Sequence, residues 1–116
     1  MDLLSWLPFG EVPEIDGEEL YERLKETPAP VVIDVRTNLE FAQGHIDGAI
    51  NVPITELNSR LESLDLYTDD FIVAICLTAH RSIPAVRLFQ EAGIEDACQL
   101  EGGMLAWNRA GLPTTE

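Results

Sequence analysis

Hydrophobic residues in this chain of 116 residues form short runs that alternate with segments in which they recur at helical spacing. The runs predict β-strands buried on both faces, because such strands need no alternation with polar residues. The other segments predict helices with one apolar face, and Thr55 is expected to cap one of them. The predicted strands occupy residues 12–15, 31–34, 49–52, 71–75 and 97–100, and the predicted helices occupy residues 17–26, 39–43, 55–64, 82–92 and 104–110.

The order of these elements predicts an α/β fold. Strands that alternate with helices are typical of a mainly parallel central sheet, here of about five strands, with helices on both faces. Functional residues of such a fold lie beyond the carboxyl ends of the strands. Asp34, Arg36 and Cys76 stand at those positions, so we expect the site at this edge of the sheet.

Length and composition indicate one domain. A chain with 46% hydrophobic and 24% charged residues is globular, and at this length it can bury roughly two thirds of its unfolded surface. We expect residues 12–116 to form the domain and residues 1–11 to form an apolar arm. The arm is too short to cross a bilayer and carries Asp2 where a secretory signal has a basic residue. It is expected to cover part of the core, with a partner contact through Trp6 and Phe9 as the alternative.

The charge balance excludes some classes of partner. Seven Lys and Arg residues stand against 21 Asp and Glu, a net charge of −14 that repels nucleic acid phosphates and anionic membranes. We expect no metal and no cofactor. Two cysteines without an export signal favour the cytoplasm. A disulfide between Cys76 and Cys98 is disfavoured, because Cys98 lies in a separate predicted strand.

The segment that begins at Cys76 carries the candidate chemistry, because it joins a predicted strand to a predicted helix. Backbone N–H groups in such a loop and the positive end of the helix dipole favour an anion, and Arg81 adds a permanent cation. These features favour the thiolate of Cys76, which is the nucleophilic form. A buried cysteine that only packs is the alternative, and the polar residues around it argue against that reading.

Three segments of the chain together resemble the rhodanese-domain sulfurtransferases. The active-site loop of that family has a Cys, two residues, a Gly, one residue, an Arg and a Ser. This chain keeps Cys76, Arg81 and Ser82 and has Ala79 where Gly is common. The family's amino-terminal and carboxy-terminal signatures resemble residues 31–36 and 40–53 upstream and residues 100–107 and 111–113 downstream. The resemblance implies a rhodanese-like fold.

The resemblance also implies sulfur transfer through Cys76. Its thiolate would attack the sulfane sulfur of thiosulfate or a low-molecular-weight persulfide, and the resulting persulfide would pass its outer sulfur to a thiol or cyanide. Arg81 would bind the anionic sulfur donor or hold the loop, and pairing with a carboxylate that only stiffens the loop is the alternative. The residues expected to surround the substrate are Leu77, Thr78, Ala79, His80, Arg81 and Ser82.

The expected partners follow from this activity. They are the small-molecule sulfur donor, the thiol acceptor and, as an alternative, an acceptor protein. The chain is expected to be a monomer or a homodimer.

Several neighbouring residues are expected to be structural. Asp34 and Arg36 should form an ion pair that orients loops, with Glu40 as a further partner of Arg36. His45 should be a hydrogen-bonded structural residue. Cys98 should pack in the core, with the role of a resolving thiol as the alternative.

Ala79 is the departure from the family loop. Glycine adopts left-handed backbone conformations at little cost, whereas another residue there is strained by about 1 kcal/mol or more. We therefore expect either a strained alanine or a loop of different curvature.

Two other functions fit parts of this pattern. Dual-specificity phosphatases share the fold and use a Cys-to-Arg loop, but four residues separate Cys76 from Arg81, one fewer than in the phosphatase pattern. A phosphate group needs the wider loop. A non-catalytic or carrier-type rhodanese module that binds a partner protein is the second alternative, and such modules commonly lack the cysteine.

Overall fold

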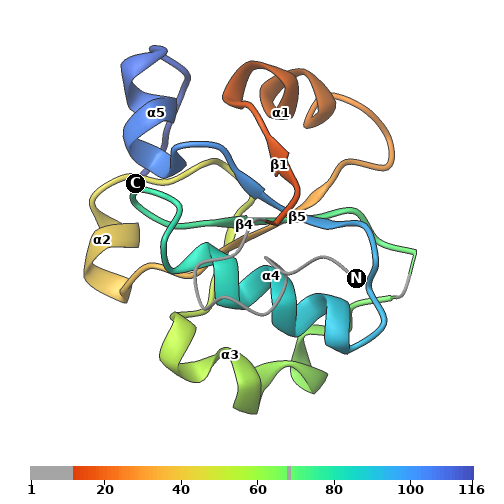
Figure 1. Cartoon of the computed structure of the whole chain (residues 1–116). Helices are drawn as coiled ribbons and strands as arrows, with labels where there is room; N and C mark the ends of the chain where they lie inside the picture. Colours follow the sequence, from red (N-terminus) through yellow and green to blue (C-terminus); the bar gives the residue numbers. More distant parts are fainter. Residues whose placement is uncertain (1–11, 68) are drawn as a thin grey trace.

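A parallel sheet forms the centre of the molecule (Figure 1). The computed structural model describes residues 12–67 and 69–116, and the arm predicted at residues 1–11 lies outside them. Within the described residues the sheet has five strands in the order β1-β5-β4-β2-β3, and all neighbours are parallel. The strands are β1 (Glu14–Ile15), β2 (Val31–Asp34), β3 (Ile50–Asn51), β4 (Ile72–Ile75) and β5 (Ala97–Leu100). The predicted α/β fold is confirmed.

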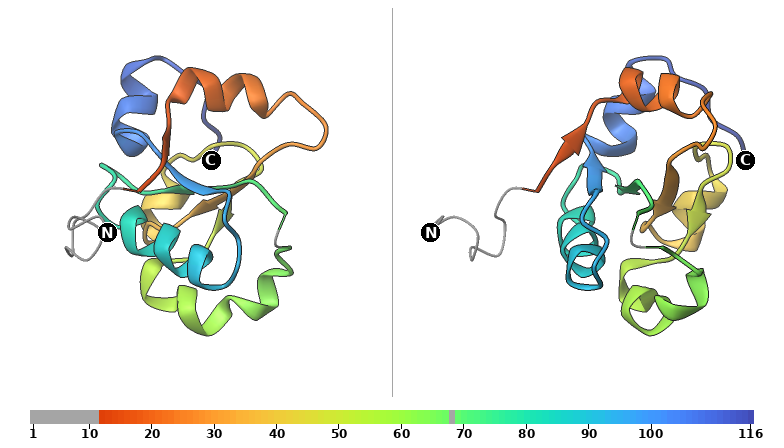
Figure 2. Two further views of the ribbon diagram at one scale, coloured as in Figure 1. Left: turned by 45° about the vertical axis from the view of Figure 1, so that its right-hand side comes forward. Right: turned by 90° about the vertical axis from the view of Figure 1, so that its right-hand side faces the viewer.

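Helices cover both faces of this sheet (Figure 2). The helices are α1 (Gly17–Arg23), α2 (Asn38–Ala42), α3 (Ile54–Arg60), the 3-10 helix η2 (Glu62–Leu64), α4 (Ser82–Glu91) and α5 (Gly103–Arg109). α1 and α5 lie on one face, and α3 and α4 lie on the other (Figure 1). α2 follows β2 at the carboxyl end of the sheet.

The core is divided by the sheet into two clusters, because successive strand residues point to opposite faces. Leu57 of α3 and Phe89 of α4 are buried in the first cluster, and Leu20 of α1 and Trp107 of α5 are buried in the second. These four helices thus have the apolar faces that their spacing predicts.

The start of α3 differs from the prediction by one residue. The helix begins at Ile54, and Pro53 is its N-cap without a side-chain hydrogen bond, so Thr55 is not the cap. The backbone N–H of Ile54 donates to the carbonyl of Val35 at 3.0 Å, and Pro53 has a φ of −50° that suits the start of a helix. The neighbouring strand therefore sets this helix end.

Strand register brings the two parts of the site together. Asp34 of β2 pairs with Ile75 of β4, so the residues after these strands leave the sheet at the same edge. Cys76 and Arg36 therefore begin adjacent loops. The start of α5 also reaches this edge, because Met104 donates its backbone N–H to the carbonyl of Cys76 at 2.8 Å.

Candidate active site

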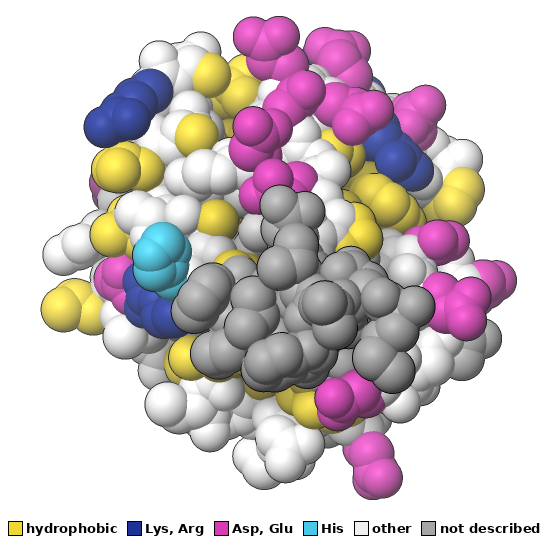
Figure 3. All heavy atoms as spheres, in the orientation of Figure 1, with side chains coloured by type: hydrophobic (Ala, Val, Ile, Leu, Met, Phe, Trp, Pro, Cys, Tyr) yellow, Lys and Arg dark blue, Asp and Glu magenta, His cyan; other side chains and the backbone are white. Residues whose placement is uncertain are grey.

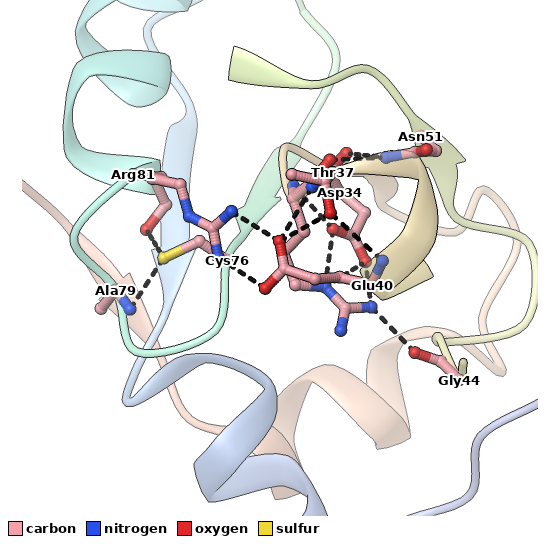
Figure 4. Close-up of polar contacts among 10 residues, drawn as sticks. Asp34, Thr37, Glu40, Gly44, Asn51, Cys76, Ala79 and Arg81 are labelled. Carbon is pink, nitrogen blue, oxygen red and sulfur yellow. Dashed lines mark hydrogen bonds and ion pairs between the residues drawn. The ribbon is translucent and has the colours of Figure 1, made fainter. Parts of the chain in front are cut away.

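Cys76 lies at the base of the loop between β4 and α4, with its side chain 1% exposed. The backbone N–H of Ala79 donates to Cys76 Sγ at 2.8 Å (Figure 4). The hydroxyl oxygen of Ser82 lies 3.6 Å from the same sulfur. The cysteine is part of the first core cluster, yet its sulfur faces polar groups, which distinguishes it from a cysteine that only packs.

The backbone of Ala79 is left-handed, with a φ of +86°. This is the conformation that glycine adopts easily and alanine does not. The loop therefore keeps the curvature expected with glycine, and of the two expected outcomes the strained alanine is found. This turn presents the Ala79 N–H to the sulfur.

The start of α5 contacts the base of the same loop. Besides the bond to Cys76, the backbone N–H of Leu105 donates to the carbonyl of Leu77 at 3.0 Å. Gly103 makes this approach possible, because a Cβ at its position would lie 2.5 Å from both carbonyl oxygens. Sequence reasoning missed this role of Gly103, although the paired glycines of the downstream signature were a signal for it.

Arg81 forms an ion pair with Glu40 of α2. Its Nη1 donates to Glu40 Oε1 at 2.6 Å and its Nη2 donates to Oε2 at 2.9 Å (Figure 4). Thr37 and Glu40 also form a capping box at the start of α2, which fixes the carboxylate. The expected pair between Arg36 and Glu40 is wrong, because this bidentate contact occupies Glu40. The structure shows the carboxylate pair that was the alternative for Arg81.

This ion pair changes the ionisation of both groups. The hydrogen bonds from Arg81 lower the pKa of Glu40 from 4.5 to about 2, and the hydrogen bonds to Glu40 raise the pKa of Arg81. The side chains are 33% and 27% exposed, so solvent screens part of the interaction. The pair nevertheless holds the pKa of Glu40 well below its usual range.

Asp34 and Arg36 form the predicted buried ion pair. Arg36 Nη2 donates to Asp34 Oδ2 at 2.8 Å and to the carbonyl of Gly44 at 2.8 Å. Asn51 donates its side-chain N–H groups to the carbonyls of Asp34 and Arg36. Buried charges need additional hydrogen bonds, such as the one from Arg36 to Gly44. The Asn51 amide joins the end of β3 to the end of β2 beneath the site.

A recess of about 340 Å³ lies beside the Cys76 loop, between α2 and α5. Leu77 lines it together with Arg36, Glu40 and Asn108. Among the loop residues, Leu77, Thr78 and His80 are exposed, while Ser82 is buried. Of the predicted substrate-binding residues, Leu77 lines the recess, whereas Ser82 is buried in the protein interior. A larger recess of about 720 Å³, lined in part by Tyr21 and Trp107, contains none of the predicted site residues.

A second polar feature near Cys76 was not predicted. Ser82 Oγ donates to Gln99 Oε1 at 2.6 Å, and Gln99 Nε2 donates to Glu14 Oε2 at 3.0 Å. Ser82 and Gln99 are buried. Gln99 gave no signal in the sequence, because a single polar residue in a strand is usually a solvent-facing one.

Two other residues have the structural roles expected of them. The Nδ1 atom of His45 is 2.8 Å from the carbonyl oxygen of Phe41, and the two rings stack at 3.6 Å. Cys98 lies in the second cluster, on the face of the sheet opposite Cys76, and both cysteines are free. Burial raises the pKa of the Cys98 thiol to about 11. Cys98 is therefore a packing residue and is not placed to resolve a bond on Cys76.

Charge is unevenly distributed over the surface. Figure 3 shows acidic side chains gathered over α1, and fewer of them on the side where α2 and the Cys76 loop lie. Among the described residues, no group of three or more His, Cys, Asp and Glu side chains could hold a metal ion. Within the same part of the chain, no helix is long and apolar enough to cross a membrane.

These features define an α/β protein with a buried cysteine at the base of the loop between a central strand and a helix. Residues 16–110 match the family model for the rhodanese-like domain, and the chain belongs to this family. The family prediction made from the three signatures is confirmed.

Three relatives are similar to this chain over most of its length. The chain is 35% identical over 102 residues to a sulfurtransferase of Allochromatium vinosum, covering 88% of this chain and 94% of the relative. It is 44% identical over 96 residues to an HTH-type transcriptional regulator of Mycobacterium tuberculosis, covering 81% of this chain and 41% of the regulator. An uncharacterized Synechocystis protein is 38% identical over 96 residues, covering 82% of this chain and 52% of that relative. The chain thus spans about half the length or less of two of these relatives.

A solved structure agrees with the fold. The crystal structure of a rhodanese-related protein from Thermoplasma volcanium has a TM-score of 0.80 and 33% identity, and the match covers 90% of this chain and 98% of the other.

Replacement of Ala79 by glycine should stabilise the protein. Ala79→Gly removes the left-handed strain, and we expect a gain of about 0.5–1 kcal/mol in the free energy of unfolding, measured by urea denaturation. Ala106→Gly is the matched control, since Ala106 lies inside α5 and glycine there should cost about 1 kcal/mol. A loss of stability in both variants would show that Ala79 is not strained.

Replacement of Glu40 should remove a contribution to stability that depends on pH in a defined window. Because the folded pKa of Glu40 is about 2 and its ordinary value is 4.5, the pair stabilises the fold above pH 4.5, and this contribution is lost as the pH falls toward 2. Glu40→Gln should therefore lower the free energy of unfolding by about 1 kcal/mol at pH 7. The difference in free energy of unfolding between Glu40→Gln and the parent protein should shrink as the pH falls from 4.5 to about 2.

The control for this change is Glu56→Gln, because Glu56 makes an exposed pair with Arg60 at 3.4 Å. It should change the free energy of unfolding at pH 7 by less than about 0.5 kcal/mol. A Glu40→Gln difference that stays constant from pH 7 to pH 2 would contradict the assignment.

Proposed function

We propose that this chain is a rhodanese-type sulfurtransferase with Cys76 as its nucleophile. The observation that carries the proposal is the contact of 2.8 Å between the Ala79 N–H and Cys76 Sγ. A backbone N–H that points at the sulfur stabilises the negative charge of the thiolate there. Family membership and the name of the Allochromatium relative support the same activity.

The proposed reaction is a double displacement. The Cys76 thiolate attacks the outer sulfur of thiosulfate or of a low-molecular-weight persulfide, and the S–S bond of the sulfur donor breaks with its electron pair leaving on sulfite or on a thiolate. This gives a Cys76 persulfide. An acceptor thiolate or cyanide then attacks the outer sulfur, which leaves with the acceptor and restores the Cys76 thiolate. No external oxidant or reductant is needed.

Arg81 is proposed to serve both the loop and the sulfur donor. Its bidentate contact with Glu40 ties the loop to α2, and a guanidinium has further N–H groups beyond the two that this contact uses. Those groups would bind the anionic sulfur donor beside the recess between α2 and α5. The exposed residues Leu77, Thr78 and His80 would form its entrance, with Asp34 and Arg36 supporting the loop from the sheet.

A carrier-type module that binds a partner protein is the second candidate function. The observation that favours it is the similarity to a transcriptional regulator, in which the matching region is 41% of the length. Leu77 and Leu105, at 38% and 39% exposure beside the Cys76 loop, offer an apolar surface to an acceptor protein. The short loop keeps a phosphatase activity the least favoured of the three. We place the reaction in the cytoplasm, where thiols are kept reduced.

Persulfide formation on Cys76 tests the proposal directly. After incubation with thiosulfate, mass spectrometry should find one added sulfur atom on Cys76, and cyanide should remove it. Cys76→Ser should fold normally and lose thiosulfate:cyanide activity, because a hydroxyl cannot hold the transferable sulfur. Cys98→Ser, the matched control, should keep the activity. Substantial activity in folded Cys76→Ser would exclude this mechanism.

Steady-state kinetics separate the roles of Arg81. If Arg81 binds the anionic sulfur donor, Arg81→Ala should raise KM for thiosulfate about tenfold, and Arg81→Lys should restore only part of the loss, because a point charge does not reproduce the planar guanidinium. Arg60→Ala, on α3, is the control cation and should leave KM unchanged. An unchanged KM in Arg81→Ala, together with a lower free energy of unfolding, would leave Arg81 with only the loop-holding role.

A further inference from the structure

A chain of hydrogen bonds connects Cys76 to the surface through groups that the proposed reaction does not use. Ser82 is the first residue of α4, Gln99 lies in β5, and Glu14 lies in β1. Glu14 and Gln99 are direct partners across the β1–β5 pair. Ser82 and Gln99 are 0% and 4% exposed, whereas Glu14 is exposed. These hydrogen bonds therefore connect a surface carboxylate to the buried sulfur.

The chemistry of these groups fixes the direction of each hydrogen bond. A carboxylate only accepts hydrogen bonds, so the Gln99 amide must turn its N–H₂ group to Glu14, as the contact of 3.0 Å between Nε2 and Oε2 shows. The amide oxygen then faces Ser82 Oγ at 2.6 Å. Because a serine hydroxyl has one hydrogen, that hydrogen is used by Gln99.

Ser82 is left with only lone pairs for Cys76. At 3.6 Å from Sγ, its oxygen can accept a hydrogen bond from the thiol but cannot donate one to the thiolate while Gln99 holds the hydroxyl. The thiolate then has the Ala79 N–H as its hydrogen-bond donor among the described residues. In this arrangement Ser82 can accept a hydrogen bond from the Cys76 thiol, and the Ala79 N–H can donate one to the Cys76 thiolate.

We propose that Gln99 and Glu14 are positioning residues that hold the Ser82 hydroxyl away from Cys76. Ser82 donates to the sulfur only when it releases Gln99, so the network restrains the reactivity of the nucleophile in the resting protein. This inference rests on the proposed role of Cys76. It gives a function to the buried polar side chain of Gln99.

The charged groups around Cys76 must stay constant for a test of this proposal. They come from the loop, α2 and the end of β2, while α5 contributes the backbone N–H groups of Met104 and Leu105 to the base of the loop. They are Arg81, His80, Glu40, Asp34 and Arg36. Changes at Ser82 or Gln99 alter none of them, so a shift in the ionisation of Cys76 can be assigned to the network.

The test is the pH profile of Cys76 alkylation by iodoacetamide in the whole chain. Trypsin cleaves after Arg81 and Arg87 and so places Cys76 and Cys98 in separate peptides, which mass spectrometry follows individually. Gln99→Met should free the Ser82 hydroxyl for the thiolate. We expect the midpoint of the pH profile to move to lower pH. Below that midpoint, the rate of Cys76 alkylation should rise about three- to tenfold, which is the effect of one hydrogen bond.

A double-mutant cycle separates positioning from a general structural effect. In a Ser82→Ala background, Gln99→Met should leave the profile unchanged, because the hydroxyl through which Gln99 acts is absent. The proposal is overturned by a folded Gln99→Met protein whose profile is unchanged or moves to higher pH. It is also overturned by an equal shift with and without the Ser82 hydroxyl.

Glu14→Gln keeps the test valid if Gln99→Met does not fold, because Glu14 is exposed. A glutamine there no longer dictates the orientation of the Gln99 amide, so the profile should move in the same direction by a smaller amount. Glu18→Gln on α1 is the control for the loss of one charge and should leave the profile unchanged. An unchanged profile in Glu14→Gln, or an equal shift in both variants, would count against the proposal.

Failure of this inference and failure of the proposed function give different results. The alkylation profile needs no sulfur donor, so it reports on the network even if Cys76 never forms a persulfide. The converse result is that Cys76 forms a persulfide while its alkylation profile is the same with and without Gln99. That result would support sulfur transfer and would show that the network does not control Cys76.

Discussion

The site depends on the close approach of α5 to the Cys76 loop. The backbone N–H groups of Met104 and Leu105 donate to the carbonyls of Cys76 and Leu77, and this is possible only because Gly103 has no side chain to strike those carbonyls. Helix N-termini leave N–H groups without intrahelical partners, and the loop supplies the acceptors. One contact therefore completes the helix end and fixes the base of the loop that carries the nucleophile.

Two ion pairs of different character hold the rest of this edge. Arg36 and Asp34 have side chains 6% and 0% exposed, and removal of one partner from such a buried pair costs about 3–5 kcal/mol. Arg81 and Glu40 are about a third exposed and contribute about 1 kcal/mol. The buried pair thus contributes more to holding the sheet edge than the partly exposed pair does.

The sequence pattern predicts the strands, the helix faces and the position of Cys76 because these depend on short-range periodicity. It does not predict that Glu40 pairs with Arg81 instead of Arg36, because both cations reach the same edge and only the three-dimensional arrangement selects one. The network at Gln99 is hidden for a similar reason. Its partner Glu14 is 85 residues away in sequence, and a polar residue in a strand gives no sign of which face it occupies. The start of α3 was missed by one residue because a contact with Val35 sets it.

The strained backbone of Ala79 can be understood from these contacts. A left-handed alanine costs about 1–2 kcal/mol, which is small beside the 5–15 kcal/mol that stabilises an ordinary domain. The loop is held at its base by α5, at its far end by the pair between Arg81 and Glu40, and inside by the contact between Ala79 and Cys76 Sγ. Relaxation of Ala79 would break the last of these and disturb the others. The substitution for glycine is therefore tolerated as local strain, and the loop keeps the curvature that brings an N–H to the sulfur.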